Sequence, residues 1–224
     1  MKLFYHPVST TCRPILLLAQ HDGIELEYQL VDLLSGEHLS ESYAAMNPSR
    51  QVPLLEDDDF RLTESSAILK YLAEKFHSPS YPADLRQRAR INERMDWFNT
   101  GFYRDLGYCL VYPQVIPGYR RENPAVQGSL LAWGRERSIK WLTILDQHLI
   151  GSNKYVCGNE LTIADYLGAS ILTLGDVIRL EYSKYPNVVR WVGTMKTLPA
   201  WEKANEGFYT HFVAGFKDAQ FQGL

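Results

Sequence analysis

The sequence predicts an α+β protein in which a small N-terminal domain of strands and helices precedes an all-helical C-terminal domain. Three observations support this prediction. Short strand-like and helical segments alternate up to residue 76, a stretch with two prolines and no apolar periodicity follows at 77–84, and only helical patterns come after it. We therefore expect a mixed domain at 1–76, a linker at 77–84 and a helical domain at 85–224.

The first domain has the element order β-α-β-α-β-β-α. Pro14 suits the first turn of the first helix and Gly23 suits its C-terminal cap. A β-α-β crossover gives a parallel strand pair, and the last two strands form a hairpin around a turn of three aspartates. This order predicts a thioredoxin-like domain, with strands at 2–5, 25–32, 52–56 and 60–63 and helices at 12–21, 36–46 and 64–76.

The second domain shows helical patterns at 85–112, 125–149, 162–178 and 188–198. Thr162 and Asp165 have the spacing of a capping box, which is a structural motif. Phe98, Phe102, Tyr108 and Tyr112 are spaced as core residues of a helix, although some of them are also suited to line an apolar pocket. A last helix after Gly207, with phenylalanines at 208, 212 and 216, either folds over such a pocket or packs on the helical domain.

Composition and charge exclude several classes of protein. The chain has 224 residues, 46% hydrophobic and 22% charged, as in ordinary globular proteins. Its net charge of −3 gives no general attraction to nucleic acid or to anionic membranes. No apolar run approaches the ~20 residues that cross a bilayer, and the first residues lack a signal-peptide pattern. We expect no nucleic-acid partner and no membrane partner.

The cysteines indicate a reducing environment. Cys12, Cys109 and Cys157 are odd in number, lack CxxC or zinc spacing, and are too few for a disulfide framework. We therefore expect a cytoplasmic protein without a bound metal.

The turn before the first helix is the first candidate site. Ser9 stands near free N–H groups and the positive end of the helix dipole, where an anion such as a thiolate is stabilised. Its hydroxyl is able to donate to a bound sulfur anion, and it is equally able to act only as a helix cap. Cys12 is the rival group, because a thiolate at a helix start is activated, but its apolar neighbours favour a buried residue.

Two further segments offer backbone groups. Val52 before Pro53 would expose its main chain to an extended ligand, or Pro53 is simply an edge-strand proline. Glu64 and Ser65 start a helix, where free N–H groups bind a carboxylate or where the serine is only a cap.

Six segments together carry a resemblance to a known family. The chain resembles the cytosolic glutathione transferases, and in particular the theta class and its bacterial dichloromethane dehalogenase relatives. The segments are YHPVSTTCRP at 5–14, DLLSGEHLS at 32–40, NPSRQVPLL at 47–55, LTESSAILKYL at 62–72, YPADLRQRAR at 81–90 and YVCGNELTIAD at 155–165.

The resemblance implies a role for each matching residue of the N-terminal domain. Ser9 matches the serine that holds the glutathione thiolate, and Val52 before Pro53 matches the backbone clamp on the cysteinyl group. Glu64 and Ser65 match the pair that binds the γ-glutamyl end. His38 and Gln51 match positions near the glycine carboxylate.

The resemblance also implies an enzyme of detoxification. It would transfer the thiolate of glutathione, its co-substrate, to a small electrophile in a pocket of the helical domain, without a cofactor. A homodimer is implied as well, and a stripe formed by Arg86, Arg90 and Arg94 is either dimer-facing or solvated.

The chain departs from the theta pattern at two positions. Relatives often carry an arginine six residues after the match of Trp97, where this chain has Tyr103 followed by Arg104, so both become candidate electrophile-site residues. Relatives often carry lysine where Gln51 stands. Two other functions remain: a glutathione-dependent thiol-disulfide oxidoreductase, which would need a reactive cysteine near Ser9, and a non-catalytic glutathione-binding module.

Overall fold

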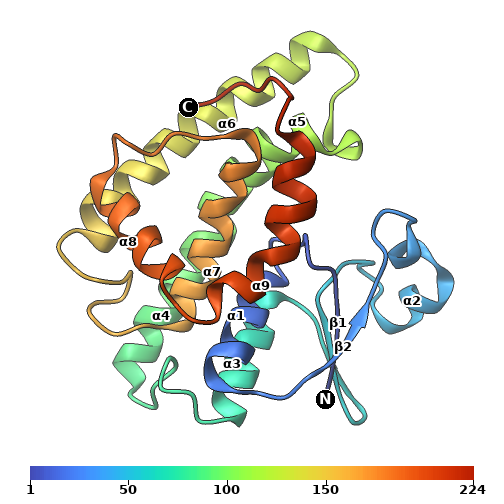
Figure 1. The fold of residues 1–224 in the computed structure, drawn as a ribbon, viewed down its shortest axis with the longest axis vertical. Coiled ribbons are helices and arrows are strands. Elements are labelled where there is room, and N and C mark those ends of the chain that lie inside the picture. The colour runs from blue at the N-terminus through green and yellow to red at the C-terminus, as the bar shows by residue number, and fades with distance from the viewer.

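A four-stranded sheet forms the centre of the N-terminal domain. The computed structural model describes residues 1–224, and the sheet has the order β2-β1-β3-β4 (Figure 1). β1 pairs with β2 in parallel and with β3 antiparallel, and β3 and β4 form the antiparallel hairpin. The predicted thioredoxin-like order is confirmed; the strands are β1 Lys2–Tyr5, β2 Glu27–Leu30, β3 Leu54–Asp57 and β4 Phe60–Leu62.

The helices of this domain lie on both sides of the sheet. α1 (Arg13–Asp22) and α3 (Ser65–Lys75) pack together on one side, and α2 (Glu41–Met46) lies on the other (Figure 1). α1 has proline in its first turn and ends at Gly23, whose φ of 68° is left-handed, as predicted. The predicted helix at 36–46 is divided into a short 3-10 segment, η1 (Glu37–Leu39), and α2, because the Ser40 side chain caps α2.

The segment between α3 and the next helix is held by hydrogen bonds. The Ser78 N–H donates to the Ala73 carbonyl, and the Ile163 N–H donates to the Ser80 carbonyl. Ser78 and Ser80 are buried and their hydroxyl oxygens lie 2.7 Å apart. The segment predicted as a linker is thus packed against the start of a helix in the second domain.

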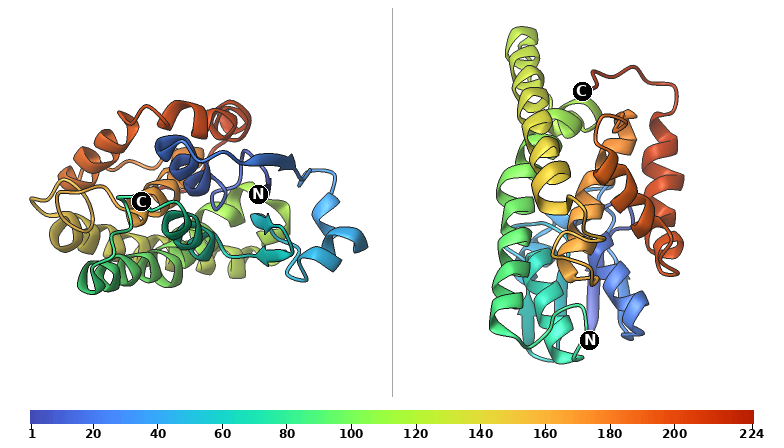
Figure 2. Two further views of the ribbon diagram at one scale, coloured as in Figure 1. Left: turned by 90° about the horizontal axis from the view of Figure 1, so that it is seen from below. Right: turned by 90° about the vertical axis from the view of Figure 1, so that its left-hand side faces the viewer.

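The C-terminal domain is entirely helical. None of its helices combines the length and apolarity needed to span a membrane. Figure 2 shows the first long helix running along one side of the molecule, where α4 continues through two π-helical segments into α5. The elements are α4 Leu85–Trp97, η2 Phe98–Phe102, η3 Arg104–Val111, α5 Tyr112–Val115, η4 Pro117–Tyr119, α6 Pro124–Ile144, η5 Leu145–Ile150, α7 Ile163–Leu172, η6 Thr173–Ile178, α8 Pro186–Lys196, α9 Trp201–Gly207, η7 Phe208–Val213 and η8 Ala214–Phe216.

α7 is the central helix, and every one of its residues is buried. It contacts α1, α3 and α4, so it joins the two domains. The predicted capping box is confirmed at its start, where the N–H and hydroxyl of Thr162 both donate to the Asp165 carboxylate. That carboxylate also accepts from the Val156 N–H and the Trp191 indole. Four donors therefore surround one buried carboxylate.

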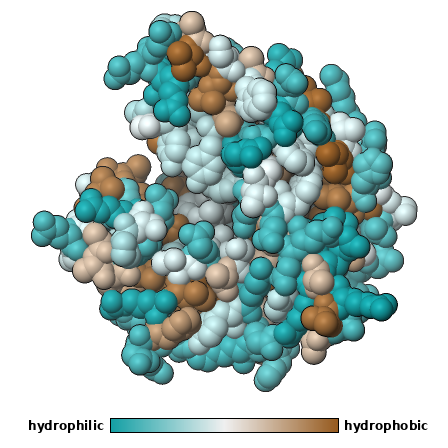
Figure 3. All heavy atoms as spheres, turned by 180° about the vertical axis from the view of Figure 1, so that it is seen from behind, coloured by the Kyte–Doolittle hydropathy of each residue, from teal (hydrophilic) through white to brown (hydrophobic).

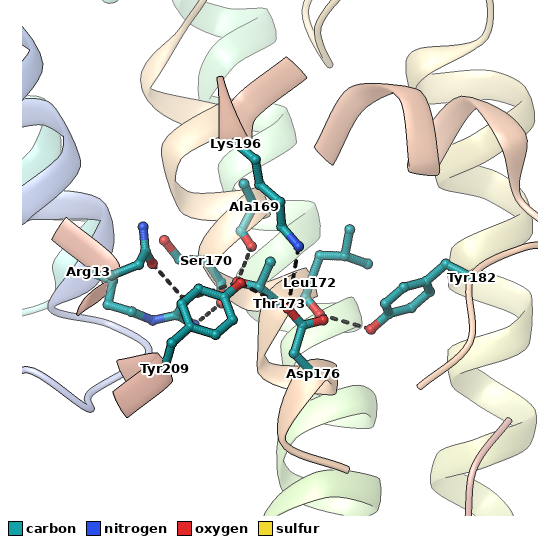
Figure 4. A network of polar contacts seen from close by, with 10 residues as sticks. Arg13, Ala169, Ser170, Leu172, Thr173, Asp176, Tyr182, Lys196 and Tyr209 are labelled. Atoms are coloured by element: carbon teal, nitrogen blue, oxygen red, sulfur yellow. Dashed lines mark hydrogen bonds and ion pairs between the residues drawn. The ribbon is translucent and has the colours of Figure 1, made fainter. Parts of the chain in front are cut away.

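A buried arginine ties the start of α1 to the C-terminal helices. Arg13 donates to the Thr173 hydroxyl and the Asn205 side chain, each at 2.9 Å, and to the Ser170 carbonyl. Its guanidinium lies 3.7 Å from the centroid of the Phe208 ring. Figure 4 shows it reaching from α1 into a polar network around η6. Burial lowers the pKa of Arg13 to about 10, and no carboxylate pairs with it, so neutral oxygens and the Phe208 ring hold this cation.

Candidate functional site

Sheet topology brings the three predicted binding segments to one end of the sheet. β1 and β3 are antiparallel with Phe4 opposite Leu54, so the end of β1 lies beside the start of β3. β3 and β4 are antiparallel with Leu55 opposite Leu62, so the end of β4 lies there too. The turn with Ser9 follows β1, Val52 precedes β3, and Glu64 follows β4. The sequence-predicted groups are therefore neighbours in space.

Ser9 lies half-buried in the turn that precedes α1. Its Oγ accepts from the Cys12 N–H at 3.3 Å and lies 3.1 Å from the Thr11 hydroxyl oxygen. The Thr11 hydroxyl donates to the Val52 carbonyl at 3.2 Å. Because Thr11 has a single hydroxyl proton, Ser9 is the donor in the Ser9–Thr11 contact. The Ser9 proton is thus held by a surface hydroxyl group, which an incoming anion is able to replace.

Cys12 is fully buried at the N-cap position of α1. It packs in a small core with Val31, Tyr43 and Val52. Burial raises the pKa of the Cys12 thiol to about 11, although a hydrogen bond with Ser9 acts in the opposite direction. The thiol therefore stays protonated near neutral pH and out of contact with solvent, as the apolar neighbours in the sequence suggested.

Two side-chain hydrogen bonds hold the loop before β3 in place. The Gln51 carbonyl accepts from the Tyr43 hydroxyl and from the Asn47 side chain, both at 2.7 Å. The peptide bond between Val52 and Pro53 is cis. The Val52 carbonyl accepts the Thr11 hydroxyl, while its N–H makes no hydrogen bond within the protein. An extended ligand would therefore find a free N–H group at this position.

The start of α3 offers backbone donors without a side-chain cap. Glu64 precedes the helix with a φ of 65°, a conformation that non-glycine residues rarely adopt, and it is exposed. Ile68 is the first residue whose N–H bonds back to the Glu64 carbonyl, so the N–H groups at 65–67 have no helical acceptor. Ser65 is buried beside them. This end of α3 is suited to bind a carboxylate.

His38 and Gln51 lie on the part of the domain that carries α2. His38 is in η1, half-buried, and its Nδ1 is buried without a hydrogen-bond partner. The Gln51 side chain is exposed. No hydrogen bond joins either side chain to the other site residues, so their role stays a prediction.

The two candidates on the helical domain point in different directions. The Tyr103 hydroxyl lies 2.6 Å from that of Tyr112, which donates to the Thr10 hydroxyl beside Ser9. Arg104 instead pairs with Asp105 at 2.8 Å. The geometry therefore joins Tyr103, and not Arg104, to the first turn.

Arg104 is held on the face toward α6. Asp105 also accepts from the Trp141 indole at 2.7 Å and faces Arg137 at 3.4 Å. Burial alone would raise the pKa of Asp105, but the hydrogen bonds from Arg104 and Trp141 outweigh it and hold the pKa below its ordinary value. Arg104 thus belongs to an ion-pair network between helices, and the electrophile-site role suggested for it is not supported by its position.

Tyr108 departs from the core position that its spacing favours. The spacing predicts a core residue, yet its side chain is 39% exposed, while Tyr103 and Tyr112 are each 8% exposed. The reason is the π-helical segment η3, whose wider turn shifts the faces of the helix. The sequence signal for this shift was the spacing of Tyr103, Tyr108 and Tyr112 at i, i+5 and i+9.

One face of the molecule is hollowed. Seen from behind, a cleft separates the lobe that carries α2 from the end of the molecule that carries α5 and α6 (Figure 3). A cavity of about 610 Å³ lies elsewhere, between the end of α1, α4 and the 157–162 loop. This cavity contains none of the predicted site residues. The candidate site is therefore defined by its grouped hydrogen-bond donors and not by a cavity.

The arginine stripe faces this other cavity. Arg86 and Arg90 line it, Arg90 pairs with Glu93, and Arg94 donates to the Val156 carbonyl at 3.3 Å. Two of the three arginines therefore already have partners within the chain. Whether the stripe is dimer-facing or solvated stays a prediction.

Comparison with known proteins identifies the family of the chain. The model of the glutathione S-transferase N-terminal domain matches residues 1–74, and that of the C-terminal domain matches residues 134–199. The chain is 33% identical over 174 residues to human glutathione S-transferase theta-1, covering 77% of this chain and 72% of that protein. The chain belongs to the glutathione S-transferase family.

Within the family it is similar to the theta class and to insect classes. A structure of human glutathione transferase theta-2 in complex with glutathione matches with a TM-score of 0.85 and 27% identity, covering 100% of this chain and 93% of that one. A delta-class enzyme from Nilaparvata lugens matches with a TM-score of 0.82 and 30% identity, covering 96% and 98%. The predicted family and its theta-like character are confirmed.

Proposed function

We propose that this protein transfers the thiolate of glutathione to a small electrophilic carbon, with Ser9 as the group that stabilises the thiolate. The observation that carries the proposal is the grouping of three complementary sites at one end of the sheet. The free N–H of Val52 suits the peptide backbone of glutathione, and the uncapped start of α3 suits its γ-glutamyl carboxylate. Ser9 lies between them and the helical domain.

The role of Ser9 follows from its hydrogen bonds. Its proton points to the Thr11 oxygen, which already donates elsewhere. A thiolate is a stronger acceptor than a neutral hydroxyl, because hydrogen bonds to charged groups are stronger by about twofold. The Ser9 hydroxyl is therefore expected to turn to a bound sulfur anion and to lower the pKa of the glutathione thiol from ~8.5.

Binding of glutathione is tested by thermal unfolding with increasing ligand. Stability should rise with concentration by RT ln(1 + [L]/Kd), because glutathione binds only the folded chain. S-methylglutathione should do the same, since the contacts proposed for both ends of the peptide do not use the thiol proton. No shift of the melting temperature at millimolar concentrations of either compound would refute the proposal.

The redox alternative is disfavoured by one observation. A thiol-disulfide oxidoreductase needs an accessible thiolate, whereas Cys12 is fully buried and burial raises its thiol pKa to about 11. Cys109 and Cys157 lie on α4–α5 and beside the other cavity, away from Ser9. A non-catalytic binding module would show the thermal shift but no conjugation of any electrophile.

We also propose a homodimer, on the basis of the family alone. Sedimentation equilibrium should give about twice the chain mass of 25.7 kDa. A single species of 25.7 kDa at all concentrations would refute it.

A further inference from the structure

His6 closes the turn that carries Ser9. Its carbonyl accepts from the Ser9 N–H at 3.0 Å, and its imidazole Nδ1 accepts from the Val8 N–H at 3.3 Å. His6 is only 8% exposed, so little water competes for these two bonds. The N–H groups of two consecutive residues therefore both end on His6.

The residue between His6 and Val8 has little freedom of its own. Pro7 has a φ fixed by its ring and no N–H to donate. It also packs closely on α9, because a Cβ added at Gly207 would lie 2.5 Å from the Pro7 Cβ. The Val8 N–H makes no other hydrogen bond than the one to the imidazole. That bond therefore sets the direction in which the chain enters Ser9.

On its other side Ser9 is held by the backbone of α1. Its carbonyl accepts from the N–H groups of Cys12 and Arg13, at 3.2 and 3.3 Å. These bonds are made by main-chain groups and do not depend on which side chains are present. The entry into Ser9 thus depends on a side chain, and the exit from it does not.

Only a neutral imidazole is able to make the bond to Val8. A neutral ring has one N–H and one acceptor nitrogen, whereas the imidazolium has two N–H groups and no acceptor. Since Nδ1 is the acceptor here, the proton of the neutral His6 ring is on Nε2. Protonation of Nδ1 would set two N–H groups against each other and break the bond.

The surroundings of His6 favour the neutral ring. Burial lowers the pKa of His6, Asp32 after β2 acts in the opposite direction, and His211 on η7 lowers the pKa again. The Asp32 carboxylate is bound by the N–H groups of Leu34 and Ser35. The net direction is downward, so the acceptor nitrogen is present at neutral pH and is lost as the solution becomes acidic.

We propose that His6 is a positioning residue for Ser9, whose neutral imidazole holds the turn in the geometry that directs the Ser9 hydroxyl to the glutathione sulfur. This inference rests on the proposed glutathione transfer. His6 acts through the turn and touches none of the reacting atoms. Without its acceptor nitrogen the bound thiol should ionise less readily, while the Val52 N–H and the start of α3 bind the peptide as before.

Two substitutions separate the acceptor from the ring. His6→Asn places an amide oxygen near the position of Nδ1, two residues before the N–H that it has to accept, as in an Asx turn. His6→Gln places its amide near the position of Nε2, beyond the reach of Val8. Each variant is titrated with pH as its glutathione complex, by the ultraviolet absorbance of the thiolate, and its rate is measured with benzyl chloride as the electrophile.

His6→Gln should lower both kcat and the thiolate fraction at pH 6.5 by about threefold to tenfold, which is part of the effect of a lost hydrogen bond to a charged group. KM for glutathione should change by less than about twofold, because the groups that bind the peptide are untouched. His6→Asn should recover most of the loss. His21→Gln, on the exposed far end of α1, is the matched control and should change neither measurement.

A double variant tests whether His6 acts through Ser9. In a Ser9→Ala protein, His6→Gln should cause no further loss, whereas general damage to the domain would add to the loss from Ser9→Ala. Acid gives a second test, because the wild type loses its acceptor nitrogen and His6→Asn keeps its oxygen. The rate of His6→Asn relative to the wild type should therefore rise as the pH falls from 7 to 5.

Three results would each overturn the role of His6. They are additive losses in the double variant, no recovery with asparagine, and a relative rate of His6→Asn that stays constant with pH. A His6→Gln protein equal to the wild type, beside an impaired Ser9→Ala protein, would also remove His6 and leave Ser9 in place. If Ser9→Ala itself keeps the full rate and thiolate fraction, the proposed function of Ser9 is wrong.

Discussion

The starts of α1 and α7 use similar polar residues for opposite purposes. At α7 the Asp165 carboxylate is fully buried and accepts four hydrogen bonds, so no bonding capacity is left for a ligand. At α1 the Ser9 hydroxyl is half-exposed. It donates to the Thr11 hydroxyl, which a bound anion is able to replace as the acceptor. A helix start whose polar group has all its hydrogen bonds within the protein stabilises the fold. A helix start whose polar group can still bond to a ligand is free for chemistry.

The largest expected effect is on the free energy of unfolding, for a change at the start of α7. Asp165→Ala removes the acceptor of Val156, Thr162 and Trp191 and leaves three buried N–H groups without partners. The free energy of unfolding should fall by ~3 kcal/mol or more, at about 1 kcal/mol or more for each group. Urea denaturation measures it. Asp165→Asn should lose less, because its Oδ1 still accepts from Val156 and Trp191 while its NH2 faces the two donors of Thr162. A near-neutral result for Asp165→Ala would contradict our account.

Ser9→Ala should leave stability nearly unchanged and lower the rate of conjugation. Loss of a hydrogen bond to a thiolate costs ~1.5–3 kcal/mol, or roughly 10- to 150-fold in rate. Because the pKa of bound glutathione rises, the loss should be greater at pH 6.5 than at pH 9, where the thiol ionises without help. Ser9→Thr keeps the hydroxyl and serves as control. An unchanged pH–rate profile in Ser9→Ala would remove Ser9 from the mechanism.

Glu64→Ala should reduce affinity more than turnover, because the proposed site places Glu64 at the end of glutathione that is remote from sulfur. We expect a loss of ~1 kcal/mol, about fivefold in Kd, by isothermal titration. Glu93→Ala, on an exposed part of α4, is a control of equal charge change. Normal affinity combined with a lost rate would show that Glu64 acts on the reaction and not on binding.

The smallest effect is expected at Cys12. Cys12→Ala should change the rate of conjugation by less than about twofold, since the thiol is buried and protonated. Mass spectrometry after turnover should show no mixed disulfide between Cys12 and glutathione. If such an adduct forms and Cys12→Ala is inactive, the contrast between the two helix starts is wrong.

The sequence predicts the N-terminal domain well, because local signals there are strong. Pro14 and Gly23 mark the limits of α1. The order of strands and helices along the chain is typical of a single sheet topology, the one observed. The grouping of Ser9, Val52 and Glu64 could be expected for the same reason, since each follows or precedes a strand at the same sheet end.

The orientation of the side chains on η2 and η3 could not be predicted in the same way. The π-helical segments η2 and η3 break the 3.6-residue period, so the spacing of Tyr108 favours a core position although the residue is partly exposed. The helix predicted at 64–76 ends at Lys75, so Phe76 lies past its end and is exposed. The burial of Arg13 likewise depends on residues some 160 positions away, which no local pattern reveals.

Arg13 also makes the two domains mechanically dependent on each other. Its guanidinium has no carboxylate partner, so separation of α1 from the C-terminal helices would leave Thr173, Asn205 and the Ser170 carbonyl to find new donors at once. The domains are therefore expected to unfold as one cooperative unit. A binding event at the first turn, only four residues before Arg13, should then protect the amides of α7 and α9 from hydrogen exchange as effectively as those of the sheet.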